Sequence, residues 1–336
     1  MNQIKISAVI PCYRVKKHIV DVISRIGPEV IRIYAVDDCC PEQSGDFILQ
    51  NVTNPRVVVL RNSVNLGVGG AMKNGYRQAL QDGMDIIIKI DGDGQMDPSL
   101  IPMFSTPIQD GEADYAKGNR FYDLTHISKM PFIRILGNSA LSFMTKLSTG
   151  YWNVFDVNNG FVAIHANVLS HINLDKVSNR YFFESDMLYQ IGLLRGKVVD
   201  IPMDAIYADE KSNLKIKQIF FEFLLKHVHN FFGRIFYNYY LRDFSIASIE
   251  LFIGSLFLTF GTIFGAVEWF RALTTLNPTP VGTIMLSVLT LILGIQFIIS
   301  FINYDISSVP VHCLHLKFLR KKTNFIQSDL IKLKSR

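Results

Sequence analysis

Two aspartates and a glutamine stand at alternate positions directly after an apolar segment, as Asp91, Asp93 and Gln95. That segment, Ile86–Ile90, is typical of a buried strand, so the three polar side chains follow a strand end. Two carboxylates and an amide oxygen with this spacing suit a hard divalent cation, which takes oxygen ligands and bridges phosphates. An EF-hand loop is a poor alternative because its twelfth position would be Pro102 rather than glutamate. A solvated acidic turn remains open as the simpler interpretation.

Three further strand-like segments also end in polar or glycine-rich sequence. Asp37 and Asp38 follow one of them, where a carboxylate commonly accepts from a ribose or base, although Asp-Asp-x-x-Pro is also ordinary turn chemistry. The cluster Gly67 to Gly70 opens a helical pattern containing Lys73, so backbone N–H groups and a lysine could face a phosphate. A flexible helix entry explains the same glycines equally well. The first strand ends in Pro11 to Arg14.

Short β-branched segments alternate with helical patterns over residues 1 to 213. The expected strands are Ile6–Ile10, Ile31–Val36, Arg56–Leu60 and Asp85–Ile90, and the clearest helices are Val15–Ile26 and Gly67–Gln81. This alternation predicts an α/β domain with a mostly parallel sheet and helices on both faces. Ligands of such sheets bind beyond the carboxyl ends of the strands. The polar segments described above are therefore expected to meet at one edge of the sheet.

Seven motifs occur in an order that is seen in one family. They are Val9-Ile-Pro-Cys-Tyr13, Val36-Asp-Asp38, Asn65-Leu-Gly-Val-Gly-Gly-Ala71, Ile90-Asp-Gly-Asp-Gly-Gln95, Gly118-Asn-Arg-Phe121, Asp156-Val-Asn-Asn-Gly-Phe161 and Tyr207-Ala-Asp-Glu-Lys-Ser212. With them the chain resembles the inverting GT-A (Rossmann-like) glycosyltransferases of family two. Within that family it is similar to the polyprenyl-phosphate glycosyltransferases related to dolichol-phosphate mannose synthase. The resemblance covers residues 4 to about 213.

The resemblance implies a role for each matching residue. The base, ribose and donor phosphates would be bound by nucleotide-site residues: Pro11, Tyr13, Asp37, Asp38, Gly70, Lys73 and Asp91. Asp91, Asp93 and Gln95 match the family's metal triad, which binds Mg²⁺ or Mn²⁺ on the donor diphosphate. The acceptor phosphate would meet Arg120, Arg134, Lys211 and Ser212. The Lys-Ser order is reversed relative to the family, and Cys39-Cys40 replaces the usual small polar residues after Asp-Asp.

The implied reaction needs little proton transfer. A cation at Asp91 and Asp93 would stabilise the nucleoside diphosphate that departs from the anomeric carbon. A lipid monophosphate is already anionic near neutral pH, so Arg120 and Arg134 would position it for in-line attack. Asp156 aligns with an acid of the family near the reacting centre, and we expect it to orient the acceptor or the sugar, or to take a residual proton. The alternative is that Asp156 only caps the turn that follows it. The expected catalytic set is thus Asp93, Asp156, Arg120 and Arg134.

Two long apolar stretches lie near the C-terminus, at Ile246 to Phe270 and Val281 to Asn303. Each is long enough to span a bilayer as a helix, and each is flanked on its outer side by lysines and arginines. The preceding segment mixes aromatic and basic residues, which is typical of amphipathic helices on a membrane surface. A buried helical hairpin and a plain core helix are the respective alternatives. Gly261 and Gly265 form a small-xxx-small pair, a weak sign of helix association.

These patterns predict four regions. Residues 1–213 form the catalytic domain, 214–244 the amphipathic interface helices, 245–304 a two-helix transmembrane hairpin and 305–336 a basic tail. The positive-inside rule predicts that the catalytic domain and both termini lie in the cytoplasm, and the expected location is the inner (cytoplasmic) membrane. Small residues in the spans and the family resemblance favour a homo-oligomer, with a tetramer one option.

Composition limits the remaining choices. The chain is 49% hydrophobic and 19% charged, with a mean hydropathy of +0.22, which excludes a disordered polymer. The net charge is +5, and basic residues are concentrated beside the apolar spans, which argues against nucleic-acid binding. Within these limits, the family resemblance implies a hexosyltransferase that moves one sugar from a nucleotide sugar, with UDP-glucose as the favoured type, to a polyprenyl phosphate, which would be undecaprenyl phosphate in a bacterium. Alternatives are another lipid or glycan acceptor, or a non-catalytic nucleotide-sugar sensor.

Overall fold

The computed structural model describes residues 4–122, 132–204 and 216–318 of the 336-residue chain. The chain divides into two compact units. The first contains Met1–Phe231 together with Pro310–Arg336, and the second contains Phe232–Val309. The first unit is thus built from two stretches of sequence, and the second is inserted between them.

The first unit contains a seven-stranded sheet in the order β3-β2-β1-β4-β6-β5-β7. Its strands are β1 (Ile6–Cys12), β2 (Val30–Asp37), β3 (Val57–Arg61), β4 (Ile86–Lys89), β5 (Tyr115–Asn119), β6 (Val162–His165) and β7 (Val198–Pro202). Neighbouring strands are parallel except where β6 pairs with β4 and β5. Because β6 is antiparallel to both, the carboxyl ends of β4 and β5 and the start of β6 lie at one edge.

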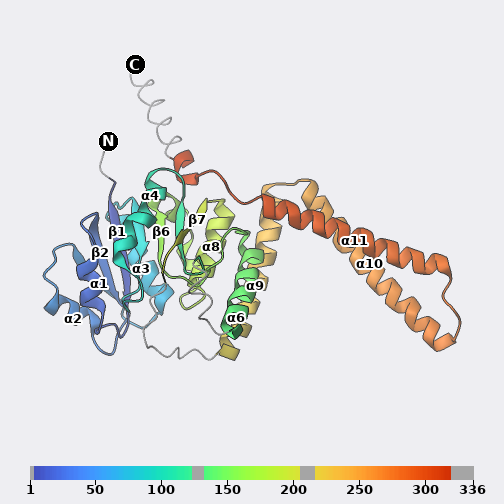
Figure 1. Cartoon of the computed structure of the whole chain (residues 1–336), viewed down its shortest axis with the longest axis horizontal. Coiled ribbons are helices and arrows are strands. Elements are labelled where there is room, and N and C mark those ends of the chain that lie inside the picture. The colour runs from blue at the N-terminus through green and yellow to red at the C-terminus, as the bar shows by residue number, and fades with distance from the viewer. Residues whose placement is uncertain (1–3, 123–131, 205–215, 319–336) are drawn as a thin grey trace, which may run out of the picture. The chain divides into compact units, whose positions relative to one another are not determined.

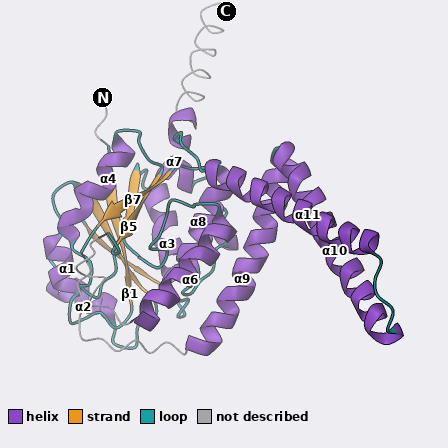
Figure 2. Ribbon diagram, turned by 45° about the vertical axis from the view of Figure 1, so that its right-hand side comes forward, coloured by secondary structure: helices purple, strands orange, loops and turns teal. Residues whose placement is uncertain are grey.

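Helices cover both faces of this sheet (Figures 1 and 2). The bounds of the larger helices are α1 (Ile19–Arg25), α2 (Ser44–Asn51), α3 (Val68–Gln81), α4 (Ile101–Gln109), α6 (Phe132–Thr149), α8 (Phe183–Leu194) and α9 (Ile216–Phe236). Apolar residues of α1, α2 and α4 pack into one core cluster with β1, β2, β4 and β5. On the other face, Gly75 of α3 lies against Val9 of β1. The central strands β1 and β4 are apolar along most of their length because they are buried on both faces.

Three short helical segments complete the first unit within the described residues. They are η1 (Pro98–Leu100), α7 (Ala166–Leu169) and η2 (Leu174–Lys176). Asp97 caps η1 by accepting from the backbone N–H of Ser99, and proline at the first helical position fits its missing N–H. The turn is thereby fixed directly after the candidate cation motif.

The second unit is a helical hairpin. After η3 (Tyr237–Arg242), a π-helical turn, α10 (Ile246–Thr275) and α11 (Val281–Ser307) run side by side (Figures 1 and 2). Both are long and apolar enough to cross a membrane, and most of their large apolar side chains are exposed. An exposed apolar surface of this extent is unfavourable in water and favourable in lipid. We therefore treat the chain as a membrane protein.

Small residues bring the two long helices close together. A Cβ atom placed on Gly261 would lie 2.8 Å from Oγ1 of Thr290, and one on Gly265 would lie 2.4 Å from Oγ of Ser287. Ser287 also donates to the carbonyl of Gly261. The small-xxx-small pair therefore packs the hairpin within one chain. Near the entry to the hairpin, the buried Asp305 accepts from Arg234 at 2.6 Å and from Tyr239 at 2.6 Å.

The fold confirms the prediction of an α/β, GT-A-like domain with two apolar C-terminal helices. The observed strands agree with the predicted ones to within one or two residues at most ends. The first helix begins at Ile19 rather than Val15, because residues 16–18 form a turn in which the N–H groups of His18 and Ile19 both donate to the carbonyl of Val15. The division into four functional regions stays a prediction. All four cysteines are free thiols.

Candidate active site

The candidate cation motif lies in the turn that directly follows β4. Asp91, Asp93 and Gln95 are all partly exposed, and Gly94 turns the chain with a positive φ of 78°. The backbone N–H of Gln95 donates to Oδ1 of Asp93 at 3.0 Å. Partly exposed carboxylate and amide oxygens on one tight turn fit a hard cation such as Mg²⁺ or Mn²⁺.

A buried lysine stands beside this motif. Lys89, the last residue of β4, is 1% exposed, and its Nζ lies 2.7 Å from Oδ1 of Asp91. The same Nζ is 3.3 Å from Oε1 of Glu184 on α8 and donates to the carbonyl of Gly160 at 3.2 Å. Burial lowers the pKa of Lys89, but the two carboxylates outweigh it and raise the pKa above its ordinary value. Lys89 is therefore a fixed cation between three oxygens.

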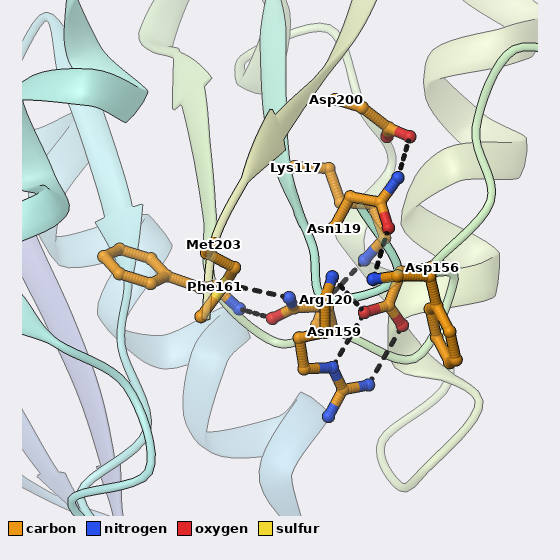
Figure 3. Close-up of polar contacts among 9 residues, drawn as sticks. Lys117, Asn119, Arg120, Asp156, Asn159, Phe161, Asp200 and Met203 are labelled. Atoms are coloured by element: carbon orange, nitrogen blue, oxygen red, sulfur yellow. Dashed lines mark hydrogen bonds and ion pairs between the residues drawn. The ribbon is translucent and has the colours of Figure 1, made fainter. Parts of the chain in front are cut away.

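Arg120 and Asp156 form a close ion pair at the end of β5. Oδ2 of Asp156 accepts from the backbone N–H of Arg120 at 3.0 Å and from its Nε at 2.7 Å, and Oδ1 accepts from Nη2 at 2.9 Å (Figure 3). Asp156 is 3% exposed, whereas the Arg120 side chain is 31% exposed. The buried carboxylate thus orients a guanidinium group that still reaches the surface.

A polar network adjoins this pair (Figure 3). Lys117, fully buried on β5, donates from Nζ to the carbonyl of Asn159. Burial lowers the pKa of Lys117 to about 8. Asn119 donates to Oδ2 of Asp200 at 2.9 Å, and burial raises the pKa of that carboxyl to about 6. Asn159 also accepts from the backbone N–H of Phe161, which closes the turn that leads into β6.

The turn at residues 156–160 connects the two halves of the site. It begins with Asp156, the partner of Arg120, and ends with Gly160, which touches the cation motif. A Cβ atom placed on Gly160 would lie 2.2 Å from Nζ of Lys89 and 2.6 Å from Oδ2 of Asp91. The structure therefore brings the predicted residues Asp91, Arg120 and Asp156 to one edge of the sheet.

Asp37 and Asp38 organise the neighbouring loops. Asp37 accepts from the backbone N–H groups of Cys40 and Gly45, at the start of α2. Asp38 accepts from the side chain of Asn62 and from the backbone N–H groups of residues 66 and 67. Both carboxylates thus shape the loops at the ends of β2 and β3. Their nucleotide-binding role stays a prediction.

The glycine-rich helix entry is packed against the segment at residues 177–180. The N–H of Gly70 donates to the carbonyl of Asn179 at 3.0 Å, and a Cβ on Gly69 would lie 2.3 Å from the carbonyl oxygen of Ser178. Lys73 is 8% exposed and donates from Nζ to the carbonyl of Val177 at 2.9 Å. These contacts favour a packing role for Gly70 and Lys73, and their predicted phosphate contact remains untested.

Other predicted residues are placed as follows. Pro11 lies within β1, and Tyr13 directly after it is 44% exposed with the guanidinium of Arg14 over its ring. Arg134 lies on α6, and its side chain is outside the described residues, as are Lys211 and Ser212. The acceptor roles of these three residues stay predictions.

Sequence reasoning missed both buried lysines. Lys89 and Lys117 each lie in a buried strand, directly before a recognised motif. A charged side chain in a buried strand must be paired, so its position is itself a signal. For Glu184 the sequence is compatible with a sugar pocket or with a surface helix start. The structure excludes the surface position, since its side chain is 12% exposed against Lys89.

A second cluster of polar side chains lies where the chain returns to the first unit. Asp114, just before β5, accepts from the backbone N–H groups of Lys197, Leu314 and His315 and from Nδ1 of His315 at 2.6 Å. Cys313 completes a buried group with metal-ligand chemistry. Because the Asp114 carboxylate already accepts four hydrogen bonds, we interpret the cluster as a clasp for residues 310–318.

Comparison with known proteins agrees with this geometry. The sequence pattern of the family described as Glycosyl transferase family 2 matches residues 7–172. An undecaprenyl-phosphate mannosyltransferase of Micrococcus luteus is 28% identical over 173 residues, covering 51% of this chain and 70% of its own. A UDP-N-acetylglucosamine–dolichyl-phosphate N-acetylglucosaminyltransferase of Methanococcus voltae is 30% identical over 154 residues, covering 46% and 61%.

A solved structure shows the same fold. Glucosyl-3-phosphoglycerate synthase of Mycobacterium tuberculosis, crystallised with Mg²⁺ and uridine diphosphate, superimposes with a TM-score of 0.52 at 16% identity. The match covers 68% of this chain and 79% of that one. At this identity the likeness concerns the architecture of the domain.

Proposed function

Because residues 7–172 form a glycosyltransferase family 2 domain related to polyprenyl-phosphate sugar transferases, we propose that the chain transfers one sugar from a nucleotide sugar to a polyprenyl phosphate. The favoured donor is a UDP-hexose such as UDP-glucose, and the favoured acceptor in a bacterial cell is undecaprenyl phosphate. The product would be a lipid-linked sugar for cell-surface glycans or lipid modification.

One observation carries this proposal. A carboxylate motif suited to a cation and an arginine oriented by a buried aspartate lie at the same edge of the sheet, joined by the turn at residues 156–160. A diphosphate donor requires the cation motif, and a phosphate acceptor requires the oriented arginine. Their proximity therefore suits a reaction between two phosphate-bearing substrates.

The negatively charged and the positively charged residues of the site have different proposed roles. Asp91, Asp93 and Gln95 would bind Mg²⁺ or Mn²⁺, which when bound supplies positive charge to the departing diphosphate. Solved GT-A neighbours that contain Mn²⁺ or Mg²⁺ support this cofactor. Arg120 would orient the acceptor, whose phosphate oxygen forms a bond to the anomeric carbon. The bond from that carbon to the nucleoside diphosphate breaks, and its electron pair leaves with the diphosphate.

Asp156 is better suited to positioning than to proton transfer. Both of its oxygens accept from Arg120, and its side chain is 3% exposed. A phosphate monoester near neutral pH has an anionic oxygen ready to attack, so the reaction needs no strong base. We therefore assign Asp156 the task of orienting Arg120 toward the acceptor.

The hairpin would hold the catalytic unit at the membrane, where a polyprenyl phosphate presents its head group. Both ends of the hairpin connect to the first unit, which supports an even number of crossings with both flanks on one side. The lysines and arginines beside the apolar helices favour the cytoplasmic side. A homo-oligomer, with a tetramer one option, is part of the same proposal.

The test is transfer of radiolabelled sugar from a panel of UDP- and GDP-sugars to undecaprenyl phosphate in detergent. Each donor is assayed with Mg²⁺ or Mn²⁺ and then with EDTA, for the wild type, Asp93→Ala and the surface control Asp175→Asn. We expect a lipid-linked product that EDTA and Asp93→Ala abolish and Asp175→Asn leaves unchanged.

Three results would contradict the proposal in whole or in part. Nucleotide binding without transfer to any lipid phosphate would favour a sensor, and transfer to a diacylglycerol or a glycan would replace the acceptor. A product that forms equally well in EDTA would remove the cation from the reaction.

A further inference from the structure

Two buried lysines flank a single residue of the sheet. Val162, the first residue of β6, pairs with Lys89 of β4 on one side and with Lys117 of β5 on the other. Directly paired residues on neighbouring strands project from the same face of a sheet. The two lysine side chains therefore rise on either side of β6, at the edge where the turn at residues 156–160 enters it.

Both ammonium groups end on consecutive carbonyls of that turn. Lys117 donates to the carbonyl of Asn159, and Lys89 donates to the carbonyl of Gly160. Lysines with 0% and 1% exposure are rare unless their charge is compensated, because removing an ammonium group from water is costly. An apolar residue would fill either strand position without that cost, so the two ammonium groups indicate a specific task.

The two lysines differ in their second contacts. Lys89 also contacts Asp91 and Glu184, so it links the turn to the donor side of the site. Lys117 donates its side-chain hydrogen bond to the turn, and the turn carries Asp156 with Arg120. One end of the turn is thus linked to the donor side and the other to the acceptor side.

We propose that Lys89 and Lys117 act as positioning residues that clamp the turn at Asn159–Gly160 and fix the spacing between Asp91 and the Arg120–Asp156 pair. This inference rests on the proposed function, because that function defines which side of the site binds the donor and which binds the acceptor. The clamp itself is a statement about contacts that can be tested without turnover. It assigns a purpose to Glu184, which balances the charge of Lys89 from α8.

The clamp suits an in-line displacement. The attacking phosphate and the departing diphosphate must stand on opposite sides of one carbon atom, and an error of about 1 Å can cost about a hundredfold in rate. Apart from the Asp156 bonds to Arg120, the hydrogen bonds described for the turn's own side chains are a short-range bond at Asn159 and one from Nδ2 of Asn159 to Sδ of Met203. Two ammonium groups anchored in rigid strands supply the missing constraint.

The test compares Lys89→Met and Lys117→Met, which keep side-chain length and remove the charge. Arg77→Met, which removes an exposed cation paired with Asp175, is the matched control. Hydrogen exchange of the amides at residues 156–161 reports on the turn, and Mn²⁺ titration by electron paramagnetic resonance without donor reports on the Asp91 side. Steady-state kinetics with donor and acceptor complete the set.

We expect faster exchange at residues 156–161 in both lysine variants and wild-type exchange in the control. In Lys89→Met, loss of one positive charge beside Asp91 tightens Mn²⁺ binding about tenfold, while kcat falls at least about tenfold. In Lys117→Met, Mn²⁺ binding changes by less than about twofold and the KM for the acceptor rises at least about fivefold. In the double variant, kcat/KM falls by less than the product of the two single-variant decreases, because both lysines act on the same turn.

Removal of Lys89 alone leaves the buried Glu184 unpaired and can prevent folding. Lys89→Met with Glu184→Gln removes that charge, and the same faster exchange is expected in this pair. Wild-type exchange at residues 156–161 in either folded lysine variant would overturn the clamp, as would weaker Mn²⁺ binding in Lys89→Met. If the wild type transfers no sugar, the proposed function fails, but the exchange and Mn²⁺ results still decide the clamp.

Discussion

Replacing Asp156 by asparagine separates two roles that an acid near the reacting atoms can have. The amide keeps the size of the side chain but has one acceptor oxygen and no charge. Three N–H groups of Arg120 now donate to the carboxylate, at 2.7, 2.9 and 3.0 Å. In Asp156→Asn at least one of them faces an NH₂ group instead.

The size of the effect follows from burial. Breaking a buried ion pair typically costs about 3–5 kcal/mol. Because the Arg120 side chain is 31% exposed, water recovers part of this, and we expect a loss of about 2–3 kcal/mol in unfolding free energy. The guanidinium group then samples several orientations, so the KM for the acceptor should rise by about 10- to 100-fold.

The assay measures initial rates of lipid-linked product against acceptor concentration from about pH 6 to 9, the range around the second ionisation of a phosphate. For a positioning role, the KM for the acceptor rises, the KM for the donor is unchanged and the shape of the pH profile is preserved. Asp175→Asn, which breaks the exposed pair with Arg77, serves as the control and should change each value by less than about twofold.

A different pattern would refute this reasoning. If Asp156→Asn abolishes kcat while the KM for the acceptor stays at its wild-type value, Asp156 acts on a proton. Loss of one limb of the pH profile in the same variant would give that result independent support.

Four further outcomes are expected. Gly160→Ala places a methyl group on the ammonium of Lys89 and should lower stability by about 1–3 kcal/mol and impair transfer, as measured by melting and by the transfer assay. Asp114→Asn should release residues 310–318 to limited proteolysis, because one amide oxygen cannot accept four hydrogen bonds. Gly261→Ala should lower the melting temperature in detergent although alanine favours helix, and Gly282→Ala, whose Cβ meets nothing within 4 Å, should not. Burial lowers the pKa of His227 to about 4, so the folded state binds fewer protons than the unfolded state between pH 6.5 and 4. The free energy of unfolding should therefore fall by up to about 3 kcal/mol as the pH decreases through this range. A series of denaturation curves at different pH values should show this decrease for the wild type and a flatter dependence for His227→Gln.

The sequence predicted the sheet well where a strand is buried on both faces. The segments at residues 6–10 and 86–90 are almost entirely apolar, and a short apolar run between turn signals is typical of a strand in the middle of a parallel sheet. It predicted that the motifs after these strands would share an edge, because the carboxyl ends of parallel strands do so. Asp91 and Arg120 follow strand ends at that edge, whereas Asp156 reaches it because it precedes the antiparallel strand β6.

The contacts inside the site were beyond the reach of a pattern. Two sets of contacts depend on the antiparallel pairing of β6 between β4 and β5. One is the ion pair of Asp156 with Arg120, and the other is the pair of hydrogen bonds from Lys89 and Lys117 to consecutive carbonyls. No spacing in the sequence encodes the register of three strands that lie far apart along the chain. The same holds for the return of residues 310–318 to Asp114, which lies 200 positions away from Leu314.

That return has a consequence for biosynthesis. A ribosome completes residues 1–231 and then both apolar helices before it reaches Leu314 and His315, the partners of Asp114. The four donors that satisfy this buried carboxylate are therefore complete only after the hairpin has been made. Until then Asp114 has one backbone donor, at Lys197, and a patch of the first unit is uncovered. Completion of the first unit is thus ordered after synthesis of the apolar hairpin, so a chain arrested within the hairpin would carry an unfinished first unit.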